Sequence, residues 1–280
     1  MREEMEHNQE FLNDIESLRP LYRAEVIEMV EANIDLLLPT YDEWRNALKS
    51  VGDELGVDTQ SANEIPYGLE KVTYSSVQSG FSEEDSANPM IIGLAGPGAA
   101  GKGAFSDQLG FPKVINTTTR PKRSYETDGV QYHFVSDEKY HALSGNGSFL
   151  VASEKPGRGL YGIQKGDLQD ALEAGKAIVE ESPLALAKLS KAAQEIDPRY
   201  RFTLTYVLPP SPVLPHLAAR LANRCLDAKE DFHSQITSTT DKRQTDEFRT
   251  LVQVVRSGVS VLILVNDKVE RIAGLPIWSK

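Results

Sequence analysis

A glycine-rich stretch that ends in a lysine carries the residue types needed to bind a phosphate group. It runs from Gly96 to Gly103, with Lys102 near its end, after the apolar segment 90–95 and before a helix-compatible run at 104–109. Glycines let backbone N–H groups turn toward a phosphate, the start of a helix adds partial positive charge, and the lysine can reach the terminal phosphates of a nucleotide. We therefore predict a phosphate-binding loop rather than a chance glycine turn. Its predicted contacts are Gly96, Gly98, Ala99, Ala100, Gly101, Lys102, Gly103 and Ala104.

A second set of side chains that could hold a phosphate follows further along the chain. Arg120 and Arg123 can form a fork around one phosphate, because guanidinium groups bind oxyanions in bidentate fashion. Tyr132 could donate its hydroxyl to the same group. The alternative is a solvated surface turn, since charged turns are common on protein surfaces. Arg220 and Arg224 share one face of a predicted helix, where they can bind a phosphate or pair with nearby carboxylates.

From residue 90 onward, short apolar runs alternate with segments of helical periodicity. The predicted strands are 90–95, 113–116, 131–135, 148–152, 177–181, 202–208 and 259–265. The predicted helices are 102–109, 137–143, 166–174, 184–194, 212–224, 228–240 and 245–256. This alternation indicates an α/β fold with a mainly parallel sheet, in which ligands bind at the carboxyl ends of the strands. The glycine loop follows the first of these strands.

The first part of the chain has a different pattern. Apolar residues recur at helical spacing over 22–38, Pro39 is expected to end that helix, and a capping-box pattern at 40–43 begins a second one. After this pair of helices the periodicity fades into a polar stretch. The predicted divisions are a helical N-terminal region at 1–55, a linker or arm at 56–89 and an α/β domain at 90–280.

Negative charge is concentrated in this N-terminal part. The chain has 41 acidic and 30 basic residues. Residues 1–87 contain 20 of the acidic and 6 of the basic residues, which gives this part a net charge of −14. The remaining residues contain 21 acidic and 24 basic residues and have a net charge of +3. An acidic region of this kind could dock on a cationic cleft of the same chain, or serve as a solvated helical hairpin that supports a homodimer. The distribution argues against broad nucleic-acid binding, which needs many phosphate contacts.

Composition restricts the class of protein further. Cys225 is the single cysteine, so neither an intrachain disulfide nor a cysteine zinc site is possible, and the five histidines have no metal-ligand spacing. We therefore predict no metal site made by side chains. The N-terminus lacks the apolar stretch of a signal peptide, and the longest apolar run, 259–265, is too short to cross a bilayer. A cytoplasmic protein without a membrane partner is the expectation.

These motifs, in this order, resemble the guanylate kinase family across residues 90–270. The resemblance implies a P-loop kinase fold with a nucleoside-monophosphate-binding insert and a helical lid, ATP and Mg²⁺ as cofactors, and nucleotide substrates. It also implies that Lys102, Arg220 and Arg224 are catalytic, and that Asn266 lies beside the donor adenine. The predicted acceptor-binding residues are Asn116, Arg120, Arg123, Tyr132, Tyr161 and Glu181, together with Val151 and Ile163, which stand at acceptor positions of the family but differ from its usual residues.

Some positions depart from the family's pattern. Gly103 and Ala104 follow Lys102, so the usual magnesium-binding hydroxyl is missing and Mg²⁺ would be held mainly by phosphates and water. Val151 stands where the family has a glutamate that reads guanine, and Gln235 stands at a lid position normally filled by arginine. Guanine specificity is therefore weakly supported by the sequence.

The leading hypothesis is an ATP-dependent transferase that phosphorylates a nucleoside monophosphate, with GMP or dGMP as the family default. The missing hydroxyl, glutamate and lid arginine favour an alternative, which is a catalytically weak or inactive guanylate-kinase-like module that binds nucleotides or proteins. A further alternative is a sugar-phosphate kinase, because the apolar Tyr161-Gly162-Ile163 motif resembles the ribose bisphosphate phosphokinases.

Overall fold

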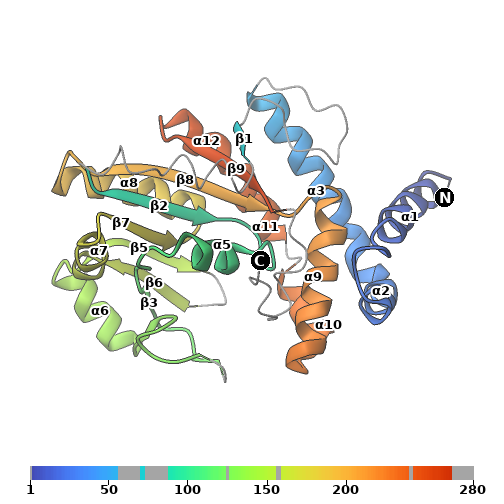
Figure 1. Cartoon of the computed structure of the whole chain (residues 1–280), viewed down its shortest axis with the longest axis horizontal. Helices are drawn as coiled ribbons and strands as arrows, with labels where there is room; N and C mark the ends of the chain where they lie inside the picture. Colours follow the sequence, from blue (N-terminus) through green and yellow to red (C-terminus); the bar gives the residue numbers. More distant parts are fainter. Residues whose placement is uncertain are drawn as a thin grey trace.

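A parallel sheet lies at the centre of the fold (Figure 1). The computed structural model describes residues 2–55, 70–72, 88–123, 126–155, 159–239 and 242–266. Within these ranges the order of the sheet is β1 (Glu70–Val72), β9 (Val261–Val265), β8 (Arg201–Leu208), β2 (Met90–Ala95) and β7 (Lys176–Glu180). Every neighbouring pair is parallel. The carboxyl ends of the strands therefore meet at one edge, where Ala95 leads into the glycine loop.

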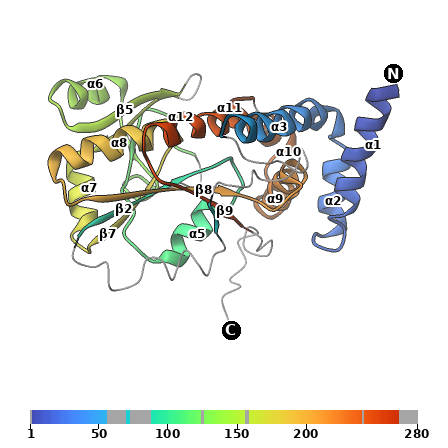
Figure 2. The same cartoon turned by 90° about the horizontal axis from the view of Figure 1, so that it is seen from above.

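Helices cover both faces of this sheet, which explains why its strands are continuous apolar runs rather than alternating patterns. Figure 2 shows α8 (Pro183–Ile196) and α12 (Leu251–Arg256) on one side and α5 (Lys102–Leu109) on the other. Every residue of β2 is buried. The predicted α/β fold with a mainly parallel sheet is confirmed. No described helix is long and apolar enough to span a bilayer.

A second, smaller sheet is inserted between α5 and β7. Its order is β4 (His133–Phe134), β3 (Thr117–Thr118), β6 (Gly159–Gln164) and β5 (Phe149–Lys155), and it is flanked by α6 (Asp137–Gly145) and α7 (Lys165–Leu172). Strand β3 pairs in parallel with β4, whereas β6 is antiparallel to both β3 and β5. The Tyr140 hydroxyl of α6 donates to the Tyr161 carbonyl at 2.6 Å and so fastens the helix to the sheet. This sheet is the predicted insert.

The N-terminal helices pack against the helices that follow β8 (Figure 1). The latter are α9 (Val213–Ala228), α10 (Phe232–Thr239) and α11 (Lys242–Arg249). The N-terminal helices are α1 (Arg2–Glu16), α2 (Ala24–Glu31) and α3 (Ile34–Leu55). Trp44 of α3 contacts Phe248 of α11 with ring centroids 5.8 Å apart, and Arg249 pairs with Glu43 at 3.4 Å. The described helices of the acidic region, α1 to α3, are thus docked on helices of the same chain.

The prediction that Pro39 ends a helix is wrong. Pro39 lies in the second turn of α3, where it removes only one hydrogen bond, to the Asp35 carbonyl. The break comes earlier, around Asn33, whose side chain donates to the Met29 carbonyl at 2.8 Å. Within the predicted linker, residues 70–72 form β1 beside β9, and the other residues from 56 to 87 lie outside the described ranges.

Boundaries inside the α/β domain also differ from the predictions. The predicted strand 113–116 is a single bridge between Lys113 and Ile178. The predicted helix 245–256 is covered by α11 and α12, which are separated at Thr250. Strand β6 is absent from the predicted strands, because its glycines interrupt the apolar pattern that would mark it.

Phe248 links the N-terminal helices to the sheet, and its removal should weaken the whole fold. Its ring is fully buried between Trp44 of α3 and Tyr206 of β8, at centroid distances of 5.8 and 5.5 Å. We expect Phe248→Ala to lower the free energy of unfolding by about 3–5 kcal/mol, because it leaves a cavity in this core. Urea denaturation followed by circular dichroism measures the change.

The control is Leu21→Ala at a surface position that is 52% exposed. We expect this variant to stay within about 0.5 kcal/mol of the wild type. Equal losses from the two variants, or a separate early transition of the N-terminal helices in the wild type, would contradict a core shared between the two parts.

Candidate active site

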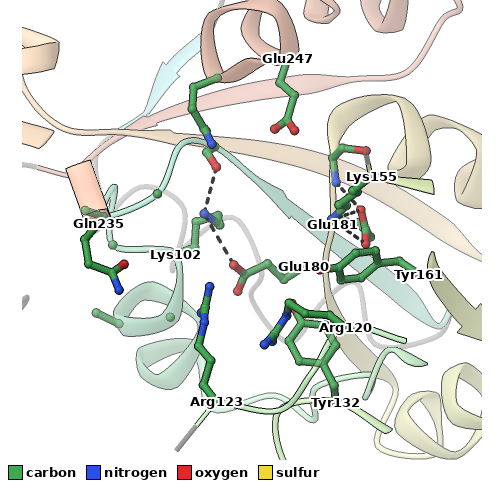
Figure 3. A pocket seen from close by; sticks show the side chains of 18 of the residues that line it. Lys102, Arg120, Arg123, Tyr132, Lys155, Tyr161, Glu180, Glu181, Gln235 and Glu247 are labelled. Carbon is green, nitrogen blue, oxygen red and sulfur yellow. Dashed lines mark hydrogen bonds and ion pairs between the residues drawn. The ribbon is translucent and has the colours of Figure 1, made fainter. Parts of the chain in front are cut away.

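A cavity of about 460 Å³ lies at the carboxyl ends of β2 and β7 (Figure 3). The central sheet, the inserted sheet and the helices α9 to α11 all contribute to its wall. The lining residues are Gly96, Gly98, Ala99, Gly101, Lys102, Gly103, Ala104, Arg120, Arg123, Tyr132, Lys155, Tyr161, Glu180, Glu181, Ser182, Arg224, Gln235, Gln244 and Glu247. The two predicted phosphate sites therefore face one space.

The backbone of the glycine loop has a conformation suited to a bound anion. Gly96 has a φ of +138°, and a β-carbon there would lie 2.3 Å from the Val207 carbonyl oxygen, so only glycine fits. Ala99 and Gly101 also have positive φ, at +61° and +97°. Backbone of this kind turns successive N–H groups inward, and α5 begins directly afterwards at Lys102. One wall of the cavity is thus a concave set of N–H donors at the start of a helix.

The Lys102 ammonium lies against the loop to which it belongs. Its Nζ donates to the Gly96 and Pro97 carbonyls at 2.9 and 3.0 Å, and it lies 3.6 Å from a carboxylate oxygen of Glu180. The lysine side chain is largely buried, whereas half of the Glu180 side chain is exposed. The ammonium is therefore held where a phosphate bound by the loop would meet it, with its charge partly balanced by Glu180.

Arg120 is the centre of the opposite wall. Its guanidinium donates to both carboxylate oxygens of Glu126, at 2.7 and 2.9 Å, and lies over the Tyr132 ring, 5.3 Å from its centroid. Glu126 also accepts from the Arg123 backbone N–H at 2.7 Å. Burial raises the pKa of Glu126, but the bonds from Arg120 and Arg123 outweigh burial, so the pKa lies below its usual value. The ion pair fixes Arg120 in the wall of the cavity.

Two tyrosines continue this wall. The rings of Tyr132 and Tyr161 meet edge to face with centroids 6.0 Å apart. Burial, and then the nearby Glu180 carboxylate, raises the pKa of Tyr132, so its hydroxyl stays neutral and can donate. Figure 3 shows this group across the cavity from Lys102.

An ion pair borders the cavity beside Tyr161. Lys155 Nζ lies 3.0 Å from the Glu181 carboxylate and 4.2 Å from the centre of the Tyr161 ring. Glu181 is almost fully buried and also accepts from the Ser182 N–H at 2.8 Å. Glu181 is among the predicted site residues, whereas Lys155 is not. Strand alternation could have identified Lys155, because it places Lys155 on the same face of β5 as Val151, which is a predicted acceptor-binding residue.

Helices α9 to α11 supply the third wall. Arg224 of α9 donates to the Gln235 side chain of α10 at 3.4 Å, and Gln244 and Glu247 of α11 also line the cavity. Gln235 therefore supports the predicted catalytic arginine. Glu180, Gln244 and Glu247 are absent from the predicted site, although the rule that ligands bind at the carboxyl ends of strands could have identified Glu180.

Arg220 is buried behind the glycine loop and does not line the cavity. Its side chain is shielded from solvent and donates to the carbonyls of Ala100, at 3.1 Å, and Asn266. The Asn266 side-chain amide donates to the same Ala100 carbonyl at 3.1 Å. These contacts support the loop from behind, and the predicted contacts of Arg220, Ala100 and Asn266 with a ligand stay predictions.

Three other residues with predicted contacts also lie away from the cavity wall. Asn116 is buried and donates to the Glu180 carbonyl at 3.0 Å, which ties the inserted sheet to the end of β7. Val151 and Ile163 are opposite each other on β5 and β6 and belong to the apolar core. Their side chains pack against the protein interior.

Carboxylates, rather than a hydroxyl of the glycine loop, are available to a metal ion in this cavity. Loop positions 103 and 104 have no hydroxyl, and the Ser106 hydroxyl is buried one turn along α5. Glu180 and Glu247 reach the cavity. In the part of the chain that the structure describes, no cluster of three or more His, Cys, Asp or Glu side chains could hold a metal ion. A divalent cation would therefore need further ligands from phosphate and water.

The matching family model and the protein relatives agree on one family. The family model described as guanylate kinase matches residues 89–257. A guanylate kinase from Nostoc sp. is 30% identical over 174 residues, which cover 60% of this chain and 83% of that protein. A guanylate kinase from Caulobacter vibrioides is 30% identical over 159 residues, which cover 55% of this chain and 71% of that protein. The crystal structure of guanylate kinase from Anaplasma phagocytophilum aligns with 67% of this chain and 81% of its own, with 19% identity and a TM-score of 0.42.

The Arg120–Glu126 pair should make stability depend on pH. Because the pKa of Glu126 is lowered from 4.5 on folding, the pair stabilises the fold above that value, and this stabilisation is lost as the pH falls through the lower, folded pKa. We expect Glu126→Gln to lower the free energy of unfolding by about 2–3 kcal/mol at neutral pH, since Arg120 loses a buried partner. The difference from the wild type should shrink below about pH 4.5.

Urea denaturation at a series of pH values measures this difference. The matched control is Asp197→Asn, which breaks the exposed pair with Arg199 and should cost less than about 1 kcal/mol at any pH. A loss for Glu126→Gln that stays constant down to acidic pH would show that the ion pair is not its source.

Proposed function

The chain belongs to the guanylate kinase family, and we propose that it transfers the γ-phosphoryl group of ATP to the phosphate of GMP. It is an ATP-dependent phosphotransferase of the nucleoside monophosphate kinase type. The observation that carries the proposal is the meeting of two phosphate-binding walls in one cavity. The glycine loop with Lys102 forms one wall, and Arg120, Tyr132 and Tyr161 form the other.

The two walls hold the two nucleotides in line. Loop N–H groups and Lys102 bind the β- and γ-phosphates of ATP, while Arg120 and Arg123 bind the phosphate of GMP. An oxygen of the GMP phosphate, already ionised at neutral pH, attacks the γ-phosphorus. The new P–O bond forms as the bond to the β,γ-bridging oxygen breaks, and that electron pair leaves with ADP. No general base is needed, so catalysis comes from alignment and from charge neutralisation, to which Arg224 contributes.

Mg²⁺ is the cofactor that the family implies, and the residues of this cavity fit it. The ion usually keeps several waters and takes one or two carboxylates together with substrate phosphates. Glu180 is such a carboxylate, since it is half exposed and lies beside Lys102 at the end of β7. Glu180 would take the place of the missing loop hydroxyl. Bound Mg²⁺ would neutralise charge on the β- and γ-phosphates of ATP.

Guanine would be recognised by a different pair of side chains from the one expected in the family. Val151 and Ile163 are buried in the core and offer no polar atom to a base. Guanine presents acceptors at O6 and N7, and donors at N1 and the N2 amine. Lys155 and Glu181 offer the complementary donor and acceptor, 3.0 Å apart beside Tyr161. Adenine has the opposite polarity at positions 1 and 6, so this pair would disfavour it.

Neither the non-catalytic binding module nor the sugar-phosphate kinase gains support from these observations. Lys102, Arg120, Arg123 and Arg224, the cations that phosphoryl transfer requires, all line the cavity. The relatives described above are guanylate kinases. A cytoplasmic setting agrees with a chain whose single cysteine, Cys225, is buried and can form no intrachain disulfide.

A coupled assay of ADP formation with ATP, Mg²⁺ and GMP tests the proposed reaction. We expect turnover with GMP, and we expect Lys102→Met to lower kcat by at least about 100-fold, because the transferred group loses its cation. Lys113→Met, which removes a more exposed ammonium paired with Asp107, is the matched control and should leave kcat unchanged. Absence of turnover by the wild type with GMP would overturn the proposal, and parallel assays with dGMP, AMP and ribose bisphosphate would show whether another acceptor is used instead.

Lys155 should determine the affinity for the acceptor without affecting the affinity for ATP. Lys155→Met keeps an unbranched side chain over Tyr161 but removes the donor to guanine, so we expect KM for GMP to rise about tenfold or more while KM for ATP is unchanged. Lys165→Met, at an exposed position on α7, is the control. An unchanged KM for GMP, or an equal rise in both KM values, would contradict base recognition by Lys155.

A further inference from the structure

The end of α9 carries a carboxylate that could compete for the arginine of the cavity wall. Asp227 follows Arg224 by three residues, a spacing at which opposite charges on a helix can pair. Asp227 also lies in the last turn of α9, where the partial negative charge of the helix end disfavours a carboxylate without a cation beside it. A pair with Arg224 would draw the guanidinium away from the cavity. What Asp227 binds therefore decides how much positive charge Arg224 offers to a phosphate.

Arg23, from the N-terminal region, binds this carboxylate. Its guanidinium pairs with Asp227 at 2.9 Å, and its Nε donates to the Asn223 side-chain oxygen at 3.0 Å. Because successive residues of an α-helix are rotated by about 100°, Asp227 projects between its two neighbours, about 40° from Asn223 and about 60° from Arg224. The fork of Arg23 therefore holds the carboxylate toward Asn223 and away from Arg224.

The segment that presents Arg23 is itself anchored on α9. Arg23 directly precedes α2, and α2 packs along α9 (Figure 1). The hydroxyl of the preceding residue, Tyr22, lies 3.2 Å from Nδ1 of His216, which is earlier on α9. Both residues of this segment lie outside the range 89–257 that the family model matches. The cation that binds Asp227 is therefore supplied by an addition to the family's domain.

Arg224 points into the cavity instead of toward Asp227. It lines the cavity wall and donates to the Gln235 side-chain oxygen at 3.4 Å. Gln235 is uncharged, so this contact orients the guanidinium without neutralising it. The positive charge of Arg224 is therefore available to a phosphate in the cavity, while the charge of Asp227 is balanced outside it.

We propose that Arg23 is a positioning residue of the phosphoryl-transfer site, which binds Asp227 and so leaves Arg224 to the phosphates. The proposal rests on the proposed function, in which Arg224 neutralises charge on the transferring group. Arg23 is not among the residues that line the cavity, so it would touch neither nucleotide. The N-terminal region would then affect catalysis through an ion pair on the outer side of α9.

Two variants and their combination test the proposal. Arg23→Met removes the guanidinium but keeps an unbranched side chain, so Asp227 becomes free to pair with Arg224. We expect kcat with ATP and GMP to fall about two- to fivefold, the range that an exposed ion pair allows, with little change in either KM. Asp227→Asn alone should leave kcat unchanged. The double variant should regain the wild-type kcat, because the competing carboxylate is gone.

This pattern separates a positioning role from simple support of the fold. If the pair between Arg23 and Asp227 only fastened α2 to α9, Asp227→Asn would cause the same loss as Arg23→Met, and the double variant would not recover. Arg19→Met, which removes an exposed partner of Glu31 in the same N-terminal region, is the matched control and should leave kcat unchanged. An unchanged kcat in Arg23→Met, or a double variant as slow as Arg23→Met, would overturn the proposal.

A crystal structure of Arg23→Met tests the same inference without turnover, so it decides even where the proposed kinase reaction fails. We expect the Arg224 guanidinium to lie within about 4 Å of the Asp227 carboxylate in about half of the molecules or more, as a twofold or larger loss of kcat requires. A guanidinium that stays on Gln235 throughout would overturn the positioning role of Arg23 and leave the proposed function untouched.

Discussion

One buried guanidinium holds the glycine loop in its working shape. Arg220 donates to the Ala100 carbonyl in the loop and to the Asn266 carbonyl after β9, and no part of its side chain reaches solvent. A charge buried in this way is tolerated only where its N–H groups find acceptors. The loop, α9 and the end of β9 must therefore be in place together. The conformation of the loop depends on the whole fold and not on its glycines alone.

The two walls of the cavity would bind phosphate by different means. The loop uses backbone N–H groups whose directions follow from the φ angles of Gly96 and its neighbours, while the opposite wall uses side chains. Lys102, Arg120 and Lys155 each lie beside a carboxylate. These carboxylates limit the repulsion among the cations before nucleotides bind, and the cations offset the repulsion between two anionic nucleotides once they do.

Local patterns explain which parts of the structure could be predicted from the sequence. The strand 90–95 and the helix 102–109 are found as predicted, because an apolar run and a glycine loop mark their ends. Tertiary packing decides the rest. Helix α3 continues through Pro39 while packed against α11, and β1 pairs with a strand distant in sequence. In the site, the burial of Arg220 and the cavity position of Lys155 depend on which elements become neighbours, and no single-sequence pattern contains that information.

Strand β1 changes what the central sheet presents to other molecules. Strand β9 pairs with β8 on one side and with β1 on the other. Without β1, the outer side of β9 would display a row of unpaired N–H and C=O groups, which is a template for the addition of a strand from another chain. With β1 in place, the edge of the sheet is a strand of three residues rather than β9, and a short edge strand offers fewer unpaired groups to a strand of another chain.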